Sequence, residues 1–252
     1  MPQPSFRLTV LAAVLLLLLL PQRASSAPLT ADALSSRQQA MVTIAALTAK
    51  GDLPGLHTAL GEGLEAGLTV NEEKEVLVHL YAYCGFPRSL QGLNTLLKVL
   101  DERKAKGIKD VAGKQASPIT STESKYERGK QNLEKLSGKP EAATKTGYAA
   151  FSPEIERFLK EHLFADLFER DVLTYQEREL VTITALVSLG GVEPMLQSHL
   201  GLGLYNGLTP AQLKQLMAVA ETSIGKKDAD AGRAVLAKVL STAQQPTEPN
   251  RK

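Results

Sequence analysis

The sequence predicts an all-α protein that is built from two tandem units of antiparallel helices. Three observations predict this fold. Apolar residues recur at steps of three and four along most of the chain, the alternating β-branched runs that are typical of strands are missing, and a stretch of about sixty residues occurs twice.

The first segment has the pattern of an export signal. Residues 1–7 end in a cation, and the apolar run 8–20 covers 13 residues, fewer than the about 20 that a membrane-spanning helix needs. Small residues follow, so we expect cleavage near Ser26 or Ala27 and assign residues 1–27 to a signal peptide. An uncleaved anchor or a buried helix is the alternative. We therefore expect an exported protein, periplasmic or secreted, without stable membrane insertion after cleavage.

Residues 28–106 form the first predicted unit. Its helices are indicated by apolar residues at helical spacing, namely Met41, Ile44 and Leu47, then Leu56, Leu60 and Leu64, then Val76, Leu77, Leu80 and Tyr83, and then Leu93, Leu96, Leu97 and Leu100. Gly67-Leu68-Thr69 predicts a helix end followed by a Thr N-cap. Gly85-Phe86-Pro87 predicts a further helix stop, with Pro87 opening the next helix.

A polar linker and a second unit follow. Residues 107–149 are rich in Lys, Ser, Thr, Gly and Glu, and within them residues 126–136 have the pattern of a short helix. The second unit is assigned to residues 150–242 and begins at Ser152-Pro153-Glu154, with Ser as N-cap. We expect residues 243–252 to be a disordered tail.

The two units are copies of each other. Val42–Leu47 matches Val181–Leu186 at an offset of 139 residues, and the offset then becomes 140. The later matches include Pro54 with Pro194, Gly63 with Gly203, Gly67-Leu68-Thr69 with Gly207-Leu208-Thr209, Gly85 with Gly225, and Gly92 with Gly232. Glycines, a proline and a cap in one register indicate a duplication, in which each copy buries its apolar face against the other.

Composition and charge exclude several classes of function. The net charge of +2 comes from Arg7 and Arg23 of the leader, and Trp is absent, so we expect no nucleic-acid partner. Cys84 is the single cysteine, which excludes an internal disulfide and a CxxC redox pair. No two histidines have HxxxH or HxH spacing, so we expect no metal.

A carboxylate and an imidazole in the second unit are the first candidates for chemistry. Glu179 and His199 lie on consecutive helices that are joined at Gly190-Gly191. Antiparallel helices with such a turn bring the two positions near each other, as a proton-transfer pair requires. A half-buried structural histidine and a solvated carboxylate are the alternative.

The first unit carries a different set of candidates. Glu75, His79 and Tyr83 follow one another at four-residue steps, which places a carboxylate, an imidazole and a phenol on one helix face that ends beside Cys84. This stripe either lines a pocket or is a helix flank. Cys84 is either a reactive thiol near His79 or a small buried side chain.

These motifs together resemble the carboxymuconolactone decarboxylase family, which includes the alkylhydroperoxidase D-like proteins. The first copy carries the resemblance in Gly67-Leu68-Thr69, then Glu75 and Tyr83, then Gly85-Phe86-Pro87, and the second carries it in Leu163–Phe168, Arg178–Ile183, and His199 eight residues before Gly207. The resemblance implies helical units that assemble as hexamers, so that this fused pair is expected to form a homo-oligomer, a trimer of two-unit chains. The redox branch has CxxCxxxH, where this chain has Val192, Met195 and His199, without either thiol.

The resemblance favours an exported enzyme that decarboxylates or isomerises a small carboxylated lactone or a related acid. In this hypothesis His199 moves the proton, Glu179 orients His199, and Arg178 pairs with a carboxylate of the small-molecule substrate. No cofactor and no metal are required. The alternatives are a thiol-dependent peroxidase, peroxiredoxin-type, acting through Cys84 with an external reductant, and a non-catalytic helical oligomer that binds a ligand.

Overall fold

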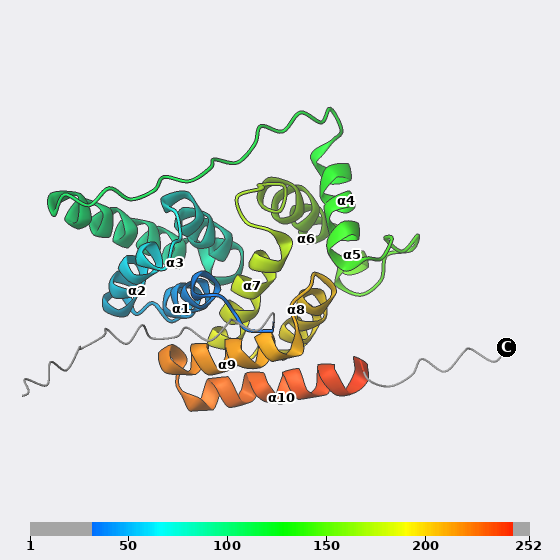
Figure 1. The fold of residues 1–252 in the computed structure, drawn as a ribbon. Helices are drawn as coiled ribbons and strands as arrows, with labels where there is room; N and C mark the ends of the chain where they lie inside the picture. The colour runs from blue at the N-terminus through cyan, green and yellow to red at the C-terminus, as the bar shows by residue number, and fades with distance from the viewer. Residues whose placement is uncertain (1–31, 244–252) are drawn as a thin grey trace, which may run out of the picture.

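The computed structural model describes residues 32–243, and their regular elements are all helices, with no strand among them (Figure 1). The all-α prediction is thereby confirmed. The predicted signal peptide, residues 1–27, and nearly all of the predicted tail lie outside the described residues. Within the described range, no helix combines the length and the apolar character that crossing a bilayer requires.

The elements are α1 (Ser36–Lys50), α2 (Leu53–Glu65), α3 (Val70–Ala105), α4 (Lys125–Ser137), α5 (Tyr148–Phe151), α6 (Pro153–Phe158), the π-helical segment η1 (Leu159–Leu167), α7 (Tyr175–Leu189), α8 (Glu193–Tyr205), α9 (Pro210–Ile224) and α10 (Lys226–Ala243).

The two units repeat element by element. Helices α1 and α2 of the first unit correspond to α7 and α8 of the second, and α3 corresponds to α9 plus α10. Helices α1, α3, α7 and α9 all begin with a reciprocal cap, in which the N-cap hydroxyl accepts a backbone N–H and the side chain three residues later accepts the N-cap N–H. The N-cap residues are Ser35, Thr69, Thr174 and Thr209. The N-caps that the sequence predicted at Thr69 and Thr209 are therefore confirmed.

A glycine divides the third helical segment of each unit. Gly85 has φ 77° and ψ 160° inside α3, and Gly225 has φ 85° and ψ 161° between α9 and α10. A positive φ is costly for any residue with a Cβ atom, so glycine suits both breaks. Pro87 follows in the first turn after the break, where its missing N–H costs no helical hydrogen bond. The predicted helix stop at Gly85-Phe86-Pro87 is confirmed.

The two units share one hydrophobic core because their helices pack across the duplication. Helix α1 packs against α7 and α9 of the second unit, and α3 packs against α7. Helix α7 is buried continuously from Arg178 to Ser188, as expected of a helix in the middle of a domain. Each unit therefore covers the apolar face of the other.

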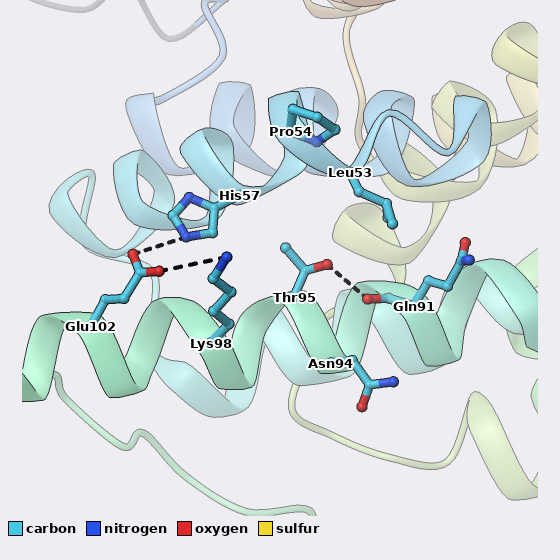
Figure 2. A pocket seen from close by; sticks show the side chains of 8 residues that line it. All are labelled: Leu53, Pro54, His57, Gln91, Asn94, Thr95, Lys98 and Glu102. Atoms are coloured by element: carbon cyan, nitrogen blue, oxygen red, sulfur yellow. Dashed lines mark hydrogen bonds and ion pairs between the residues drawn. The ribbon is translucent and has the colours of Figure 1, made fainter.

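A groove separates α2 from the second half of α3 (Figure 2). Its volume is about 750 Å³. His57 Nε2 lies 3.0 Å from the Glu102 carboxylate, and Lys98 Nζ lies 3.9 Å from it. The Thr95 hydroxyl donates to the carbonyl of Gln91 on its own helix, at 2.8 Å. Several polar groups of this groove are thus already paired with one another.

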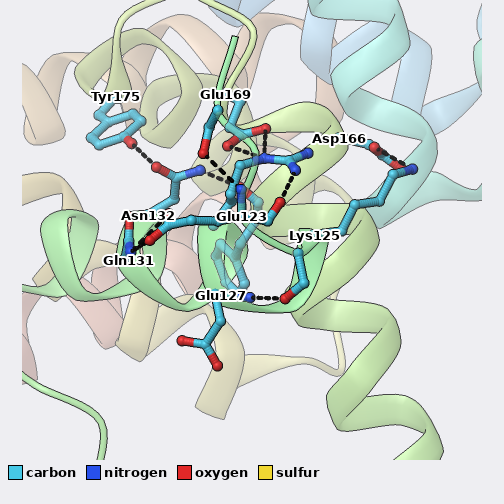
Figure 3. Close-up of polar contacts among 12 residues, drawn as sticks. Glu123, Lys125, Glu127, Gln131, Asn132, Asp166, Glu169 and Tyr175 are labelled. Carbon is cyan, nitrogen blue, oxygen red and sulfur yellow. Dashed lines mark hydrogen bonds and ion pairs between the residues drawn. The ribbon is translucent and has the colours of Figure 1, made fainter. Parts of the chain in front are cut away.

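The segment between the units is only partly irregular. Residues 107–124 cross the molecule without forming a helix, and α4 then packs along η1 of the second unit (Figure 1). Three side chains of α4 hold it there (Figure 3). Asn132 Nδ2 donates to the Phe164 carbonyl at 2.8 Å, Arg128 pairs with Glu169 at 3.0 Å, and Lys125 pairs with Asp166 at 2.8 Å. The short helix that the sequence predicted over 126–136 is confirmed, and its packing attaches it to the second unit.

The close contact between α4 and η1 depends on a glycine. A Cβ atom at Gly129 would overlap the backbone carbonyl of Lys160, whereas a Cβ at the exposed, helical Gly201 would meet nothing within 4 Å. We predict that Gly129→Ala lowers the free energy of unfolding by more than about 2 kcal/mol, because backbone must move. Gly201→Ala should raise it by about 0.5–1 kcal/mol. Denaturant unfolding followed by circular dichroism measures both, and a Gly129→Ala variant as stable as wild type would contradict this packing.

Glu73 is a carboxyl group inside the core of the first unit. Its side chain is fully buried, and neither of its oxygens has a hydrogen-bond partner among the described residues. Burial raises the pKa of Glu73 from 4.5 to about 9, although Arg103 lowers it in part. The matching position of the second copy is Leu213, which is fully buried as well. Glu73 is therefore a protonated acid at a site that suits a leucine.

Replacing this acid should remove a pH dependence of stability. Folded Glu73 keeps its proton up to a pKa of about 9, whereas the unfolded carboxyl loses it near 4.5, so the native state binds more protons between these values. The free energy of unfolding should therefore fall as pH rises from about 4.5 to about 9. We predict that Glu73→Leu removes this decrease with pH and raises the free energy of unfolding at pH 8 by more than about 2 kcal/mol. Unfolding at pH 5 and pH 8 tests it, with the exposed Glu62→Gln as a control that should keep the wild-type slope.

Candidate functional site

The carboxylate and the imidazole of the second unit form a pair. Helix α7 carries Glu179, the chain reverses at Gly190 and Gly191, whose φ values are 66° and 70°, and α8 carries His199. His199 Nδ1 donates to Glu179 Oε2 at 2.8 Å. Glu179 is fully buried, and the His199 side chain is 15% exposed. The proximity that the sequence predicted for these two residues is confirmed.

One ring nitrogen of His199 and one carboxylate oxygen of Glu179 take no part in the hydrogen bond between them. Because Nδ1 carries the proton that Glu179 accepts, Nε2 of a neutral His199 holds a lone pair, and it makes no hydrogen bond among the described residues. Glu179 Oε1 is buried and also lacks a partner there. A buried oxygen without a partner is costly, so it is a position where a bound molecule or water gains a hydrogen bond.

The stripe of the first unit meets this pair across the junction of the units. The ring of Tyr83 on α3 lies edge-on to the ring of His199, with centroids 5.6 Å apart. His79 lies one turn before Tyr83 on α3, at 5.3 Å. The two sets of candidates, one from each copy, therefore form a single cluster, which we call the junction cluster: Glu75, His79, Tyr83, Arg178, Glu179 and His199.

Arg178 takes a different place from the one that the sequence suggested. It is fully buried, and its Nη2 donates to Glu75 Oε1 at 2.7 Å and to the carbonyl of Arg170. Its guanidinium also lies over the ring of Phe168, 5.7 Å from the centroid. The charge of Arg178, which the sequence led us to expect beside a substrate carboxylate, thus has a partner inside the protein.

His79 is a neutral histidine that uses both of its nitrogens. Arg178 Nη1 lies 3.2 Å from Nδ1, and because a guanidinium can only donate, Nδ1 accepts. Nε2 then carries the proton and donates to the Thr182 hydroxyl at 2.8 Å. Burial, followed by the charges of Arg178 and His199, lowers the pKa of His79 well below its usual value. His79 positions its neighbours and has no free nitrogen for acid–base chemistry.

Tyr83 and Cys84 both remain protonated. Burial, followed by the nearby Glu179 charge, raises the pKa of Tyr83, and its buried hydroxyl has no hydrogen-bond partner among the described residues. Burial also raises the pKa of the half-buried Cys84 thiol to about 11, although Arg88 lowers it in part. A reactive cysteine needs a lowered pKa, so the environment of Cys84 does not favour a thiolate.

Three further residues that contact the junction cluster were not identified as site residues from the sequence. Arg170 pairs with Glu75 through Nε, at 3.0 Å to both oxygens, Thr182 binds His79, and the ring of Phe168 packs edge-on against His79 at 5.4 Å. Thr182 belongs to the repeated stretch Val181–Leu186, so its position was visible in the sequence. Nothing in the sequence distinguished Arg170 from a solvated cation.

The duplication contains a counterpart of the junction cluster without its titratable groups. Ala40 and Ala59 stand where the second copy has Glu179 and His199. Gln215, Val219 and Ser223 stand where the first copy has Glu75, His79 and Tyr83. In this counterpart Gln215 accepts a hydrogen bond from the Leu34 backbone N–H at 2.7 Å. The titratable side chains of such a cluster are therefore confined to one of the two equivalent places.

One comparison with known proteins gives a match. The model of the carboxymuconolactone decarboxylase family matches residues 23–97 and 153–238, which is more than half of the chain. The first stretch contains Glu75, His79 and Tyr83, and the second contains Arg178, Glu179 and His199. No curated protein matches the chain.

Removing Arg178 should destabilise the fold because Glu75 would keep a buried charge with one partner fewer. We predict that Arg178→Met lowers the free energy of unfolding by about 3–5 kcal/mol. The control is Arg233→Met, since Arg233 pairs with Glu221 and Asp230 on the surface with 36% of its side chain exposed, and this change should cost less than about 1 kcal/mol. If denaturant unfolding gave the same loss of unfolding free energy for both variants, the buried pair of Arg178 and Glu75 would not stabilise the packing of the two units.

Proposed function

The chain belongs to the carboxymuconolactone decarboxylase family, and from this premise we propose that it is an acid–base enzyme. It decarboxylates or isomerises a small carboxylated lactone or a related acid, and it does so by proton transfer without an organic cofactor. His199 is the catalytic residue, and Glu179 is its positioning partner. The fused pair of units uses one such site, at the junction cluster.

The observation that carries this proposal is the 2.8 Å hydrogen bond from His199 Nδ1 to the buried Glu179 carboxylate. This bond fixes the ring and its tautomer, so Nε2 is directed away from the protein carboxylate as a base. When Nε2 gains a proton, Glu179 offsets the positive charge of the imidazolium. The pair can therefore take up and return a proton at one atom.

In a decarboxylation, the bond between the ring carbon and the carboxylate carbon breaks, carbon dioxide leaves, and the electron pair is delocalised towards the lactone carbonyl. The delocalised anion then receives a proton from Nε2 of the His199 imidazolium at one of its ring carbons, and a proton from water restores the imidazolium. An isomerisation uses the same atom twice, first to remove a proton and then to return it at another carbon.

The surroundings of His199 support a substrate with both apolar and polar groups. Met195 lies one turn before His199 on α8 and is exposed, and Val192 is the N-cap residue of this helix. The unpartnered Tyr83 hydroxyl and Glu179 Oε1 are the polar groups left to bind a substrate. Val192 and Met195 occupy the positions of the two thiols in the redox branch, and the Cys84 thiol is protonated at neutral pH, so these observations weigh against the peroxidase alternative.

Variants at His199 and Glu179 test the proposal. We predict that His199→Gln lowers the rate of carbon dioxide release from carboxymuconolactone by about 10²–10⁴-fold, because the transferable proton is lost. Glu179→Gln should lower it more than about tenfold, because a neutral amide does not offset the imidazolium charge. In deuterated water, wild type should place one deuterium on a ring carbon of the product.

Cys84→Ser is the matched control for these variants and should keep the wild-type rate. Full turnover by His199→Gln would overturn the assignment of the catalytic residue. Peroxide consumption that disappears in Cys84→Ser would instead favour the thiol-dependent alternative.

We further propose that the protein is exported and self-associates. The leader pattern of residues 1–27 supports export. Phe86, Leu90 and Leu97 line one face of α3 and are each more than half exposed, and they support association with further copies. The matching positions on α10 are Lys226, Asp230 and Ala237, so this apolar face belongs to the first copy alone.

A further inference from the structure

We propose that a second pocket, at the junction of the two units and separate from His199, binds a small organic carboxylate. The pocket has a volume of about 420 Å³, within the range of small-molecule sites. Three parts of the chain form its walls: the first turns of α3 with Lys74 and Glu75, residues 115 and 116 of the connecting segment, and the turn with Arg170 that precedes α7. Both units and the segment between them therefore contribute to it.

The connecting segment is held over this pocket by hydrogen bonds at both of its sides. The backbone N–H groups of Val70 and Asn71 donate to the carbonyls of Val111 and Ala112, at 3.0 and 2.9 Å. Beyond the pocket, the Ser117 N–H donates to Asp171 at 2.9 Å. Residues 111–117 thus form a fixed wall, and the pocket exists as a shaped cavity between this wall and α3.

The charges around the pocket leave an excess of positive charge. Glu75 is a buried carboxylate that is shared by two guanidinium groups, those of Arg170 and Arg178. Arg170 uses Nε and Nη2 for Glu75, so its Nη1 has no partner among the described residues. Lys74 adds a further cation and likewise forms no ion pair there. Lys74 and Arg170 line the pocket together with one carboxylate, Glu75, which favours a bound anion, and an arginine beside a lysine suits a carboxylate group.

The other lining residues favour an organic anion over an inorganic one. Val78, Leu93 and Val172 give the pocket an apolar side, and Asn71 and Gln115 add amide groups. An apolar side offers nothing to sulfate or phosphate, whereas it stabilises the carbon skeleton of an organic acid. The ligand class is therefore a small carboxylic acid with an apolar body.

The duplication supplies a natural comparison for this pocket. Lys214 is the counterpart of Lys74 in the second copy and is likewise exposed on its helix, but Gln215 replaces Glu75. The buried carboxylate that assembles the cations is therefore missing beside Lys214. The pocket shares Glu75 with the junction cluster, but none of its lining residues is Glu179, His199 or Tyr83.

Calorimetric titration of the full chain with benzoate, succinate and sulfate tests the proposal. We predict that benzoate or succinate binds, that sulfate binds at least tenfold more weakly, and that added salt weakens the binding. Lys74→Met should weaken binding of the organic acid about tenfold, and Val78→Phe, which fills the pocket, should abolish it. Lys214→Met, the matched control, should bind as wild type does.

Two results would overturn this site. One is the absence of heat from both organic acids at millimolar concentration in folded protein, as judged by circular dichroism. The other is an equal affinity of Lys74→Met and Lys214→Met. Sulfate binding as tight as that of the organic acids would overturn the assignment of an organic ligand. Because His199 takes no part in the pocket, His199→Gln should bind the acid unchanged, which separates this test from that of the catalytic proposal.

Discussion

The buried ion pair between Glu75 and Arg178 is the interaction on which the rest of the arrangement depends. It joins α3 of the first unit to α7 of the second, with side chains 2% and 0% exposed. Charges this deeply buried persist only when they are paired and hydrogen-bonded, so the pair fixes the register between the two helices. Glu179 follows Arg178 on α7, and Tyr83 lies two turns after Glu75 on α3. The same pair therefore sets how Tyr83 approaches His199.

The two copies carry complementary halves of the cluster. The first copy has Glu75, His79 and Tyr83 on α3 but no Glu or His at the matching positions of α1 and α2. The second copy has Glu179 and His199 on α7 and α8 but no Glu, His or Tyr at the matching positions of α9. The retained halves meet because α3 packs against α7. In the counterpart of the junction cluster, where α1 packs against α9, neither copy contributes a titratable group at the matching positions. The substitutions concerned are Ala40 for Glu179, Ala59 for His199, Gln215 for Glu75, Val219 for His79 and Ser223 for Tyr83.

Local patterns in the sequence predicted most of the fold and one pair of the site. The repeated glycines, the caps and the helical spacing predicted the helices and their duplication, and the turn at Gly190-Gly191 predicted that Glu179 meets His199. The joining of the two sets was not predicted, because it depends on helices that pack across the duplication. For the same reason the partner of Arg178 was missed, since Glu75 is 103 residues away. The complementary losses in the two copies were the signal that could have revealed the composite site.

The two histidines of the cluster differ in how many of their nitrogens are engaged within the junction. His79 has both nitrogens engaged, and the cation of Arg178 and the burial of the ring keep it neutral. It lies between Arg178 and Tyr83, so an uncharged ring and a phenol separate the paired charges from His199. Both nitrogens of His79 and the two terminal nitrogens of Arg178 make hydrogen bonds, whereas His199 makes one through Nδ1 alone, and the Tyr83 hydroxyl and Glu179 Oε1 have no partner among the described residues. Since both units contribute residues to the cluster, neither unit alone contains it, and joining both units in one chain ensures that all of these residues are present together.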